Sequence, residues 1–170
     1  MDAITRNAPD ALALGWGNLS YFFGSRNSKN QSYIGSILVD LEQDAKITQV
    51  EKQPVLAPGR LGTFDDNGVV PSCALRVNGK IYLYYIGFKP GGTTRMDLFG
   101  GLAIAEDENS QFQRVSEAPI LDRTSRNPFI NTAPWVVQPN GNAFYVYYVS
   151  GVEWLTPDLP RYNIQIGKSL

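Results

Sequence analysis

Two adjacent carboxylates, Asp65 and Asp66, are the residues of this chain best suited to acid–base chemistry. They lie five to six residues ahead of Pro71, in a segment that Gly62 and Gly68 leave flexible enough to approach a ligand. One carboxyl group can act as a general acid or base while the other binds hydroxyl groups. The same Asp-Asp-Asn-Gly run is also a good turn sequence, in which side chains accept hydrogen bonds from backbone amides. Both interpretations stay open at this level.

Arginines and aromatic residues form a second group of candidates. A planar guanidinium can bridge two sugar hydroxyls or bind a carboxylate, and an indole ring can stack on a sugar. Trp135 falls inside an apolar run and is expected in the core, whereas Glu153 and Trp154 follow such a run and are expected in a loop. The expected ligand-binding residues are Arg26, Arg95, Arg123, Glu153 and Trp154, while other arginines at strand ends are expected to be surface charges.

Missing residue types exclude several classes of site. The chain contains no histidine, which rules out Ser-His-Asp and Cys-His catalysis and the usual histidine-bearing zinc sites. Cys73 is the single cysteine and lies in an apolar run, where a buried, inert thiol is expected. No cluster of metal-ligating residues stands out, so neither a metal nor a cofactor is expected.

Charge and hydropathy bound the partners. The formal net charge of -1 gives no basic surface for nucleic acid or for an anionic membrane, so neither is an expected partner. The first residues lack a signal-peptide pattern, and no apolar run is long enough to span a bilayer. We therefore expect a cytoplasmic location.

A threefold internal repeat organises the chain. Pro9, Pro71 and Pro134 lie 62 and 63 residues apart, and each is followed by an apolar stretch, a Gly/Asn turn and an aromatic-rich segment. Such a period is typical of arrays of supersecondary units that bury their faces against one another. The alternating and apolar runs predict strands at 10–14, 19–25, 33–40, 47–55, 71–77, 80–88, 99–106, 112–120, 135–138, 143–150 and 162–168.

These strands predict an all-β fold, a partial five-bladed β-propeller with about two and three-quarter blades of four-stranded antiparallel meanders. The short turns make consecutive strands neighbours, and Pro54 and Pro119 assign the fourth strands to sheet edges. We expect one domain with blades near residues 1–58, 59–122 and 123–170, the last incomplete. A β-sandwich is the alternative, but its water-facing strands would alternate more clearly than 82–87 and 145–149 do.

An unfinished ring would leave an apolar blade face and a sheet edge exposed to water. Either the chain is the front portion of a longer protein or copies of it associate. We expect a homo-oligomer, specifically a dimer, if the chain is stable as given.

The run Leu61–Ser72, the strand Asn78–Gly87 and the later Glu117–Arg123 resemble the five-bladed propeller glycosidases, the arabinanase, xylosidase and levanase group with their predicted glycosylase relatives. The resemblance covers the chain from about Asn7 onward and corresponds to the first half or slightly more of such a protein. It implies a funnel at the propeller axis that holds the end of one sugar chain. It also favours Arg123 as a ligand residue, because the relatives share the run 121–123.

The resemblance also indicates where catalytic acids should lie. Glycoside hydrolysis needs a protonated acid and an ionised partner, and in this group three acids precede the proline or Gly-Pro that opens the first strand of blades one, two and three. Those positions hold Ala8, Val70 and Thr132, none of which transfers protons at neutral pH. Three hypotheses follow: a glycoside hydrolase-like enzyme that uses Asp65 and Asp66, a non-catalytic carbohydrate-binding propeller, and a scaffold that recruits a partner by strand addition.

Overall fold

The protein is described by a computed structural model that covers residues 10–13, 18–139 and 143–168. Within these ranges the chain forms strands, turns and irregular segments, and no membrane-spanning helix candidate occurs there. The strands are β1 (Asp10–Ala13), β2 (Asn18–Arg26), β3 (Ser32–Asp40), β4 (Lys46–Val50), β5 (Gly68–Val77), β6 (Lys80–Pro90), β7 (Met96–Ala105), β8 (Gln113–Arg114), β9 (Asn131–Val137), β10 (Tyr145–Thr156) and β11 (Leu159–Lys168).

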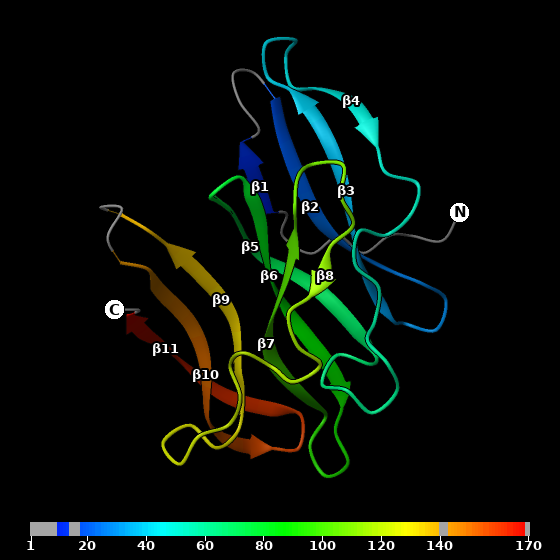
Figure 1. The fold of residues 1–170 in the computed structure, drawn as a ribbon. Coiled ribbons are helices and arrows are strands. Elements are labelled where there is room, and N and C mark those ends of the chain that lie inside the picture. The colour runs from blue at the N-terminus through cyan, green and yellow to red at the C-terminus, as the bar shows by residue number, and fades with distance from the viewer. Residues whose placement is uncertain (1–9, 14–17, 140–142, 169–170) are drawn as a thin grey trace.

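Three antiparallel meanders follow one another along the chain and form part of a β-propeller (Figure 1). Blade 1 contains β1 to β4, blade 2 contains β5 to β8, and blade 3 contains β9 to β11. The first strands of the blades lie beside each other, since β5 contacts both β1 and β9. The predicted all-β propeller portion is therefore confirmed, whereas the number of blades in a complete ring stays a prediction.

The three blades are oriented the same way, because one parallel β-bridge joins each blade to the next. Ser32 at the start of β3 pairs with Gly68 at the start of β5, and Phe99 in β7 pairs with Asn131 at the start of β9. The β2–β3, β6–β7 and β10–β11 turns and the two connections between blades consequently meet at one end of the propeller. We call this end the loop face.

The core lies between blades 1 and 2. Ile81, Leu83 and Tyr85 of β6 point to one side and are buried together with Phe22 and Ile34 of blade 1. The intervening β6 residues are only partly buried. One face of blade 2 is therefore sealed, while its other face is partly open.

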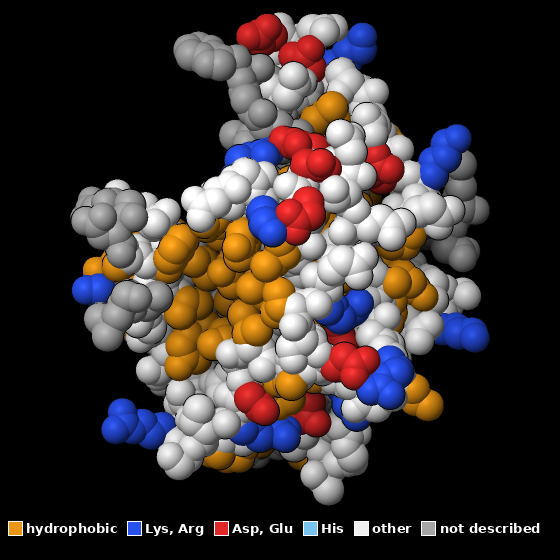
Figure 2. All heavy atoms as spheres, viewed as in Figure 1, with side chains coloured by type: hydrophobic (Ala, Val, Ile, Leu, Met, Phe, Trp, Pro, Cys, Tyr) orange, Lys and Arg blue, Asp and Glu red, His pale blue; other side chains and the backbone are white. Residues whose placement is uncertain are grey.

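The open side of blade 2 forms an apolar cleft with blade 3. The cleft measures about 250 Å³ and is lined by Tyr84, Ile120, Leu121, Val136, Phe144 and Val146. Figure 2 shows hydrophobic side chains gathered over this region, between β9 and the strands of blade 2. Cys73 is buried at the contact, as predicted, and accepts a hydrogen bond from the Val136 amide at 3.4 Å.

Two local predictions need correction. The fourth strands are much shorter than expected: β4 ends at Val50, before Pro54, and β8 holds only two residues and ends before Pro119. A proline cannot donate to a ladder, and pairing resumes only where Val55 and Ile120 donate to β3 and β7. Trp135 is 51% exposed rather than in the core, because nothing in the described chain packs on that side of blade 3.

The tight turn predicted at Asn78-Gly79 is confirmed. Both residues have positive φ, 51° and 84°, and they join the paired residues Val77 and Lys80. The other two predicted turns, Gly17-Asn18 and Gly141-Asn142, fall wholly or partly outside the described residues.

Leu83→Ala tests the location of the core. Leu83 is fully buried, so removing its side chain should lower the free energy of unfolding by about 3 kcal/mol through lost burial and a residual cavity. Urea denaturation measures the change. The control is Leu61→Ala at a residue that is 93% exposed, which should leave stability unaltered. Equal effects of the two substitutions would contradict this core.

Candidate functional site

All seven residues predicted to carry function lie at the loop face. Asp65 and Asp66 belong to the connection between β4 and β5, and Arg123 belongs to the one between β8 and β9. The others lie near the end of a strand or in the turn beyond it: Arg26, Arg95, Glu153 and Trp154. The repeat thus brings residues from three distant parts of the sequence to one end of the molecule (Figure 1).

Asp65 points into the protein rather than toward a ligand. Its side chain is fully buried and forms an ion pair with Arg114, whose Nε lies 2.8 Å from Asp65 Oδ2. Tyr85 Oη donates to the same oxygen at 3.1 Å, and Thr63 Oγ1 donates to Oδ1 at 2.9 Å. A buried carboxylate with three donors, one of them the partly buried guanidinium of Arg114, is well suited to holding the loop.

Tyr85 is held neutral in this network. Burial, together with the negative charge of Asp65 beside it, raises the pKa of the Tyr85 hydroxyl above its usual range. The hydroxyl therefore keeps its proton and donates a hydrogen bond to Asp65. Arg114 completes the contact from the outer strand β8, with its guanidinium carbon 5.8 Å from the centre of the Tyr85 ring.

Space for this network depends on missing side chains. A Cβ atom at Gly59 would lie 2.1 Å from Asp65 Oδ1, and one at Gly101 would lie 2.2 Å from the Tyr85 ring. Any larger residue at these two positions would displace the aspartate or the tyrosine. The connection before β5 and the strand β7 are therefore fitted to the ion pair.

Asp66 points the other way and stays partly exposed. Its Oδ2 accepts a hydrogen bond from the Gly62 amide at 2.8 Å, and Gly62 has a φ of 95° that favours glycine. Its second oxygen accepts no hydrogen bond from another described residue. Asp66 therefore presents a carboxylate to solvent at the loop face, as a ligand-binding or acid–base group must.

Lys89 and Asp97 extend this site, and sequence reasoning missed both. Lys89 Nζ donates to the Gly62 carbonyl at 3.2 Å, next to the Asp66 contact. Asp97 is the cross-strand partner of Lys89 in the β6–β7 ladder, and it forms an ion pair with Arg123. We call Asp66, Lys89, Asp97 and Arg123 the loop-face cluster. The signal in the sequence that could have indicated Lys89 and Asp97 was their position on either side of the β6–β7 turn.

Arg123 is held in place but remains accessible. Its Nε donates to the Phe129 carbonyl at 3.3 Å, and its guanidinium carbon lies 4.9 Å from the centre of the Phe99 ring. Its side chain is nevertheless 49% exposed. A partly ordered, accessible guanidinium can bind a polar ligand at a low entropic cost.

The other predicted ligand residues form two separate groups. Glu153 and Trp154 lie within β10, which runs on to Thr156, so the loop predicted for them is wrong. Glu153 forms an ion pair with Arg161, and the backbone amide of Arg95 donates to the Pro157 carbonyl at 2.8 Å, which ties the turns of blades 2 and 3 together. Arg26 donates to Asn30 within its own turn at 2.8 Å.

The positions that would hold catalytic acids in a glycosidase carry no ionisable group. Val70 pairs with Ile86 inside the β5–β6 ladder, and Thr132 is 3% exposed with no hydrogen-bond partner for its hydroxyl among the described residues. Ala8 lies outside the described residues. Across the described chain, no group of three or more acidic, cysteine or histidine residues could hold a metal ion.

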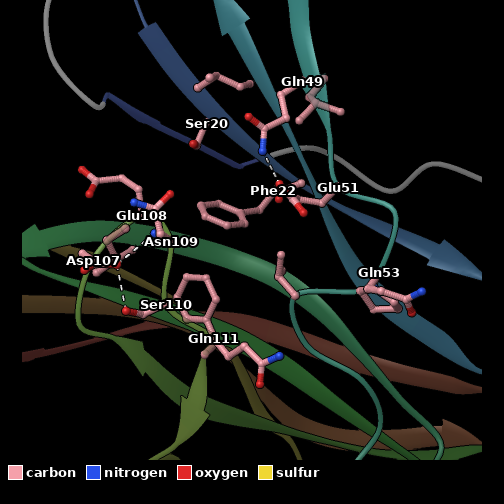
Figure 3. A pocket seen from close by; sticks show the side chains of 17 residues that line it. Ser20, Phe22, Gln49, Glu51, Gln53, Asp107, Glu108, Asn109, Ser110 and Gln111 are labelled. Carbon is pink, nitrogen blue, oxygen red and sulfur yellow. Dashed lines mark hydrogen bonds between the residues drawn. The ribbon is translucent and has the colours of Figure 1, made fainter.

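A larger groove of about 460 Å³ lies between blades 1 and 2, away from the predicted site residues. Figure 3 shows Ser20 and Gln49 of blade 1 across Phe22 from the turn at 107–111. Its three acidic residues are engaged in structure: Asp107 accepts bonds from the Asn109 amide and Ser110 hydroxyl, Glu108 binds Arg76, and Glu51 accepts a bond from Gln49. The groove is therefore a weaker candidate for ligand chemistry than the loop-face cluster.

Comparison by sequence finds two relatives of this chain. No family model matches the chain. Two curated proteins from Mycobacterium tuberculosis, of strains CDC 1551 / Oshkosh and ATCC 25618 / H37Rv, are each 35% identical over 133 residues, and both are named only as uncharacterized. The match covers 78% of this chain but 44% of theirs, so the chain spans less than half the length of these relatives.

Solved structures of glycoside hydrolases share the architecture. A family 117 glycoside hydrolase from the marine bacterium Zobellia galactanivorans superposes with a TM-score of 0.72 at 16% identity, over 97% of this chain and 52% of that one. Sucrose-6-phosphate hydrolase from Lactobacillus gasseri gives a TM-score of 0.71 at 17% identity, over 96% and 32%. The fold is therefore that of propeller glycosidases.

Arg114→Met tests the role of the buried ion pair. The substitution leaves the Asp65 carboxylate without its cation in the interior and should lower the free energy of unfolding by about 3 kcal/mol. Asp65→Asn added to Arg114→Met should cost less than the sum of the two single changes, because the charge to be compensated is gone. Chemical denaturation of all three variants measures this.

Arg60→Met is the matched control. Arg60 forms an ion pair with Glu117 in which both side chains are mostly exposed, and its loss should leave the denaturation midpoint unchanged. An Arg114→Met midpoint equal to that of Arg60→Met would refute a structural role for the buried pair.

Proposed function

We propose that the protein binds the end of a carbohydrate chain at its loop face. The observation that carries this proposal is the loop-face cluster, which presents a partly exposed carboxylate, a lysine, and an ion-paired but accessible arginine at one end of a glycosidase-type propeller. Carboxylate and guanidinium groups form charge-assisted hydrogen bonds with hydroxyl groups, and such bonds are stronger than neutral ones. The cluster matches the neutral, polyhydroxylated surface of a sugar.

Residues of blade 3 would extend the binding face. Trp154 is partly exposed near the β10–β11 turn, and Arg95 lies in the neighbouring β6–β7 turn that is bonded to it. In this proposal Trp154 supplies a stacking surface and Arg95 and Glu153 supply polar contacts. Arg26, on the blade 1 turn, lies at the opposite border of the face.

Hydrolysis is the second candidate function, and the exposure of Asp66 favours it. Asp66 is the only one of the two predicted catalytic carboxylates that a substrate can reach, so it takes the role of acid or base. In this proposal Asp97, which is paired with Arg123 at the same face, takes the second role that glycoside chemistry requires. Asp65 acts in this proposal as the residue that positions the loop. Val70 and Thr132 argue against the mechanism that the glycosidase resemblance implies, and we therefore rank binding above hydrolysis.

Asp66→Asn and Arg123→Leu test the proposal. A glycan array identifies a ligand of the purified chain, and titration calorimetry then measures its affinity. Each substitution should weaken binding by about tenfold or more, since each removes a charged hydrogen-bonding group. Arg76→Met, at the opposite end of β5, should bind like the unmodified protein.

Unchanged affinity in both loop-face variants would refute the site, and an array without any bound glycan would refute the function. Assays with chromogenic glycosides separate the two candidates. Turnover by the unmodified protein that is lost in Asp66→Asn even at glycoside concentrations high enough to offset its weaker binding would establish hydrolysis.

A further inference from the structure

The groove between blades 1 and 2 can be compared with a matching surface in the same molecule. Leu56 forms an isolated β-bridge with Ile34 in blade 1, and Leu121 forms the same bridge with Gly100 in blade 2. The strand pairing that continues from these bridges gives the remaining equivalent positions. The wall that blade 1 presents to the groove therefore corresponds to the wall that blade 2 presents to blade 3.

The two walls share some residue types and differ in others. Phe22 and Val55 line the groove, and their counterparts Tyr84 and Ile120 line the apolar cleft between blades 2 and 3. At other matched positions blade 1 carries a polar residue where blade 2 carries an aromatic or aliphatic one. These pairs are Ser20 and Tyr82, Ser36 and Leu102, and Glu51 and Val115. Contact with the next blade therefore does not account for the polar groups of the groove.

Several side chains of the groove lack a partner in the protein. Within the described part of the chain, Ser20, Ser36, Gln53 and Gln111 form no side-chain hydrogen bond, and all four line the groove. Ser20 and Ser36 are partly buried in the blade 1 wall. Partly buried hydroxyl groups take a partner from water or from a ligand. Hydroxyl and carboxamide groups both donate and accept hydrogen bonds, as a ligand rich in hydroxyl groups requires.

The charges and the backbone of the groove exclude other ligand classes. The described residues that line it include no lysine or arginine, so a phosphate or carboxylate ligand would find no counter-charge. The backbone of the blade 1 wall is already paired: the Glu51 amide donates to the Ser36 carbonyl at 3.1 Å, and the Val55 amide donates to the Ile34 carbonyl at 2.8 Å. A peptide therefore has no free strand edge to extend there.

We propose that this groove binds an uncharged oligosaccharide at a site separate from the loop face. Its volume of about 460 Å³ is in the range of small-molecule sites. Phe112 is partly exposed and packs edge to face on Phe22, with the ring centres 5.6 Å apart, so it offers an aromatic surface to the apolar side of a sugar. Figure 3 shows Phe22 between polar side chains of blade 1 and those of the turn at 107–111.

The groove and the loop face lie at opposite ends of the blades. Ser20 is near the start of β2, and the turn at 107–111 follows the end of β7, whereas the loop face holds the other ends of these strands. Binding in the groove therefore needs no residue of the loop-face cluster. The proposal does not rest on the function proposed for that cluster.

A double variant with Asp66→Asn and Arg123→Leu isolates the groove from the loop face. An array of uncharged oligosaccharides is probed with this variant, and titration calorimetry then measures the affinity for the oligosaccharide that it binds. We expect one ligand per chain. Ser36→Leu, added to the double variant, installs the residue of blade 2 and should weaken binding about tenfold or more, because it replaces a hydrogen-bonding group with an apolar one that fills the groove. Gln49→Leu should weaken binding in the same direction.

Gln113→Leu is the matched control for Gln49→Leu. Gln113 pairs with Ile104 in blade 2 as Gln49 pairs with Leu38 in blade 1, but it does not line the groove, and its substitution should leave the affinity unchanged. If Ser36→Leu alters the circular dichroism, Gln53→Ala replaces it at an exposed residue. An array on which the double variant binds no uncharged oligosaccharide, or binds only charged glycans and amino sugars, would overturn the proposal. Equal affinities of the groove variants and of Gln113→Leu would also overturn it.

Discussion

The ion pair between Asp65 and Arg114 joins the connection between blades 1 and 2 to the outer strand of blade 2, and the position of the candidate site depends on it. Asp65 precedes the innermost strand of blade 2, and Arg114 lies on its outermost strand, so the pair spans the blade from its inner to its outer edge. Tyr85 fills the space between them and also belongs to the core shared with blade 1. One contact therefore fixes the connection between two blades, and that connection displays Asp66. Asp65, a catalytic candidate in the sequence, thus helps to position the loop that carries its neighbour Asp66.

Regular features of the fold were predictable because they are local and repeated. The Asn78-Gly79 turn needs two positive φ values, which few residue pairs tolerate, and the tyrosine-rich strands have strong β-propensity. The ends of the fourth strands were not predictable to the same degree. Whether a segment continues to pair after Val50 depends on which β3 carbonyl its amides can reach, and this is decided by tertiary packing around Pro54.

The site was only half visible in the sequence for a physical reason. Asp65 and Asp66 are chemically identical and adjacent, and only the fold turns one toward Arg114, 49 residues away, and the other toward solvent. Lys89 and Asp97 belong to no motif. They join the candidate site because they pair across the β6–β7 ladder and because Lys89 donates to the Gly62 carbonyl in the connection between blades 1 and 2. Trp135 was misplaced because an apolar strand was assumed to have a neighbour on both sides. Long-range juxtaposition is the information that a single sequence does not contain.

The short outer strands have a consequence for how this protein can aggregate. A long, flat sheet edge is a template on which further chains add strand by strand, and such growth ends in fibres. Here the rim offers five residues in β4 and two in β8, followed by Pro54 and Pro119, whose missing amide protons interrupt any continuous ladder. Growth along the rims of blades 1 and 2 is thus blocked by the backbone itself, whereas β11 of blade 3 leaves a ten-residue strand at the edge of the described sheet.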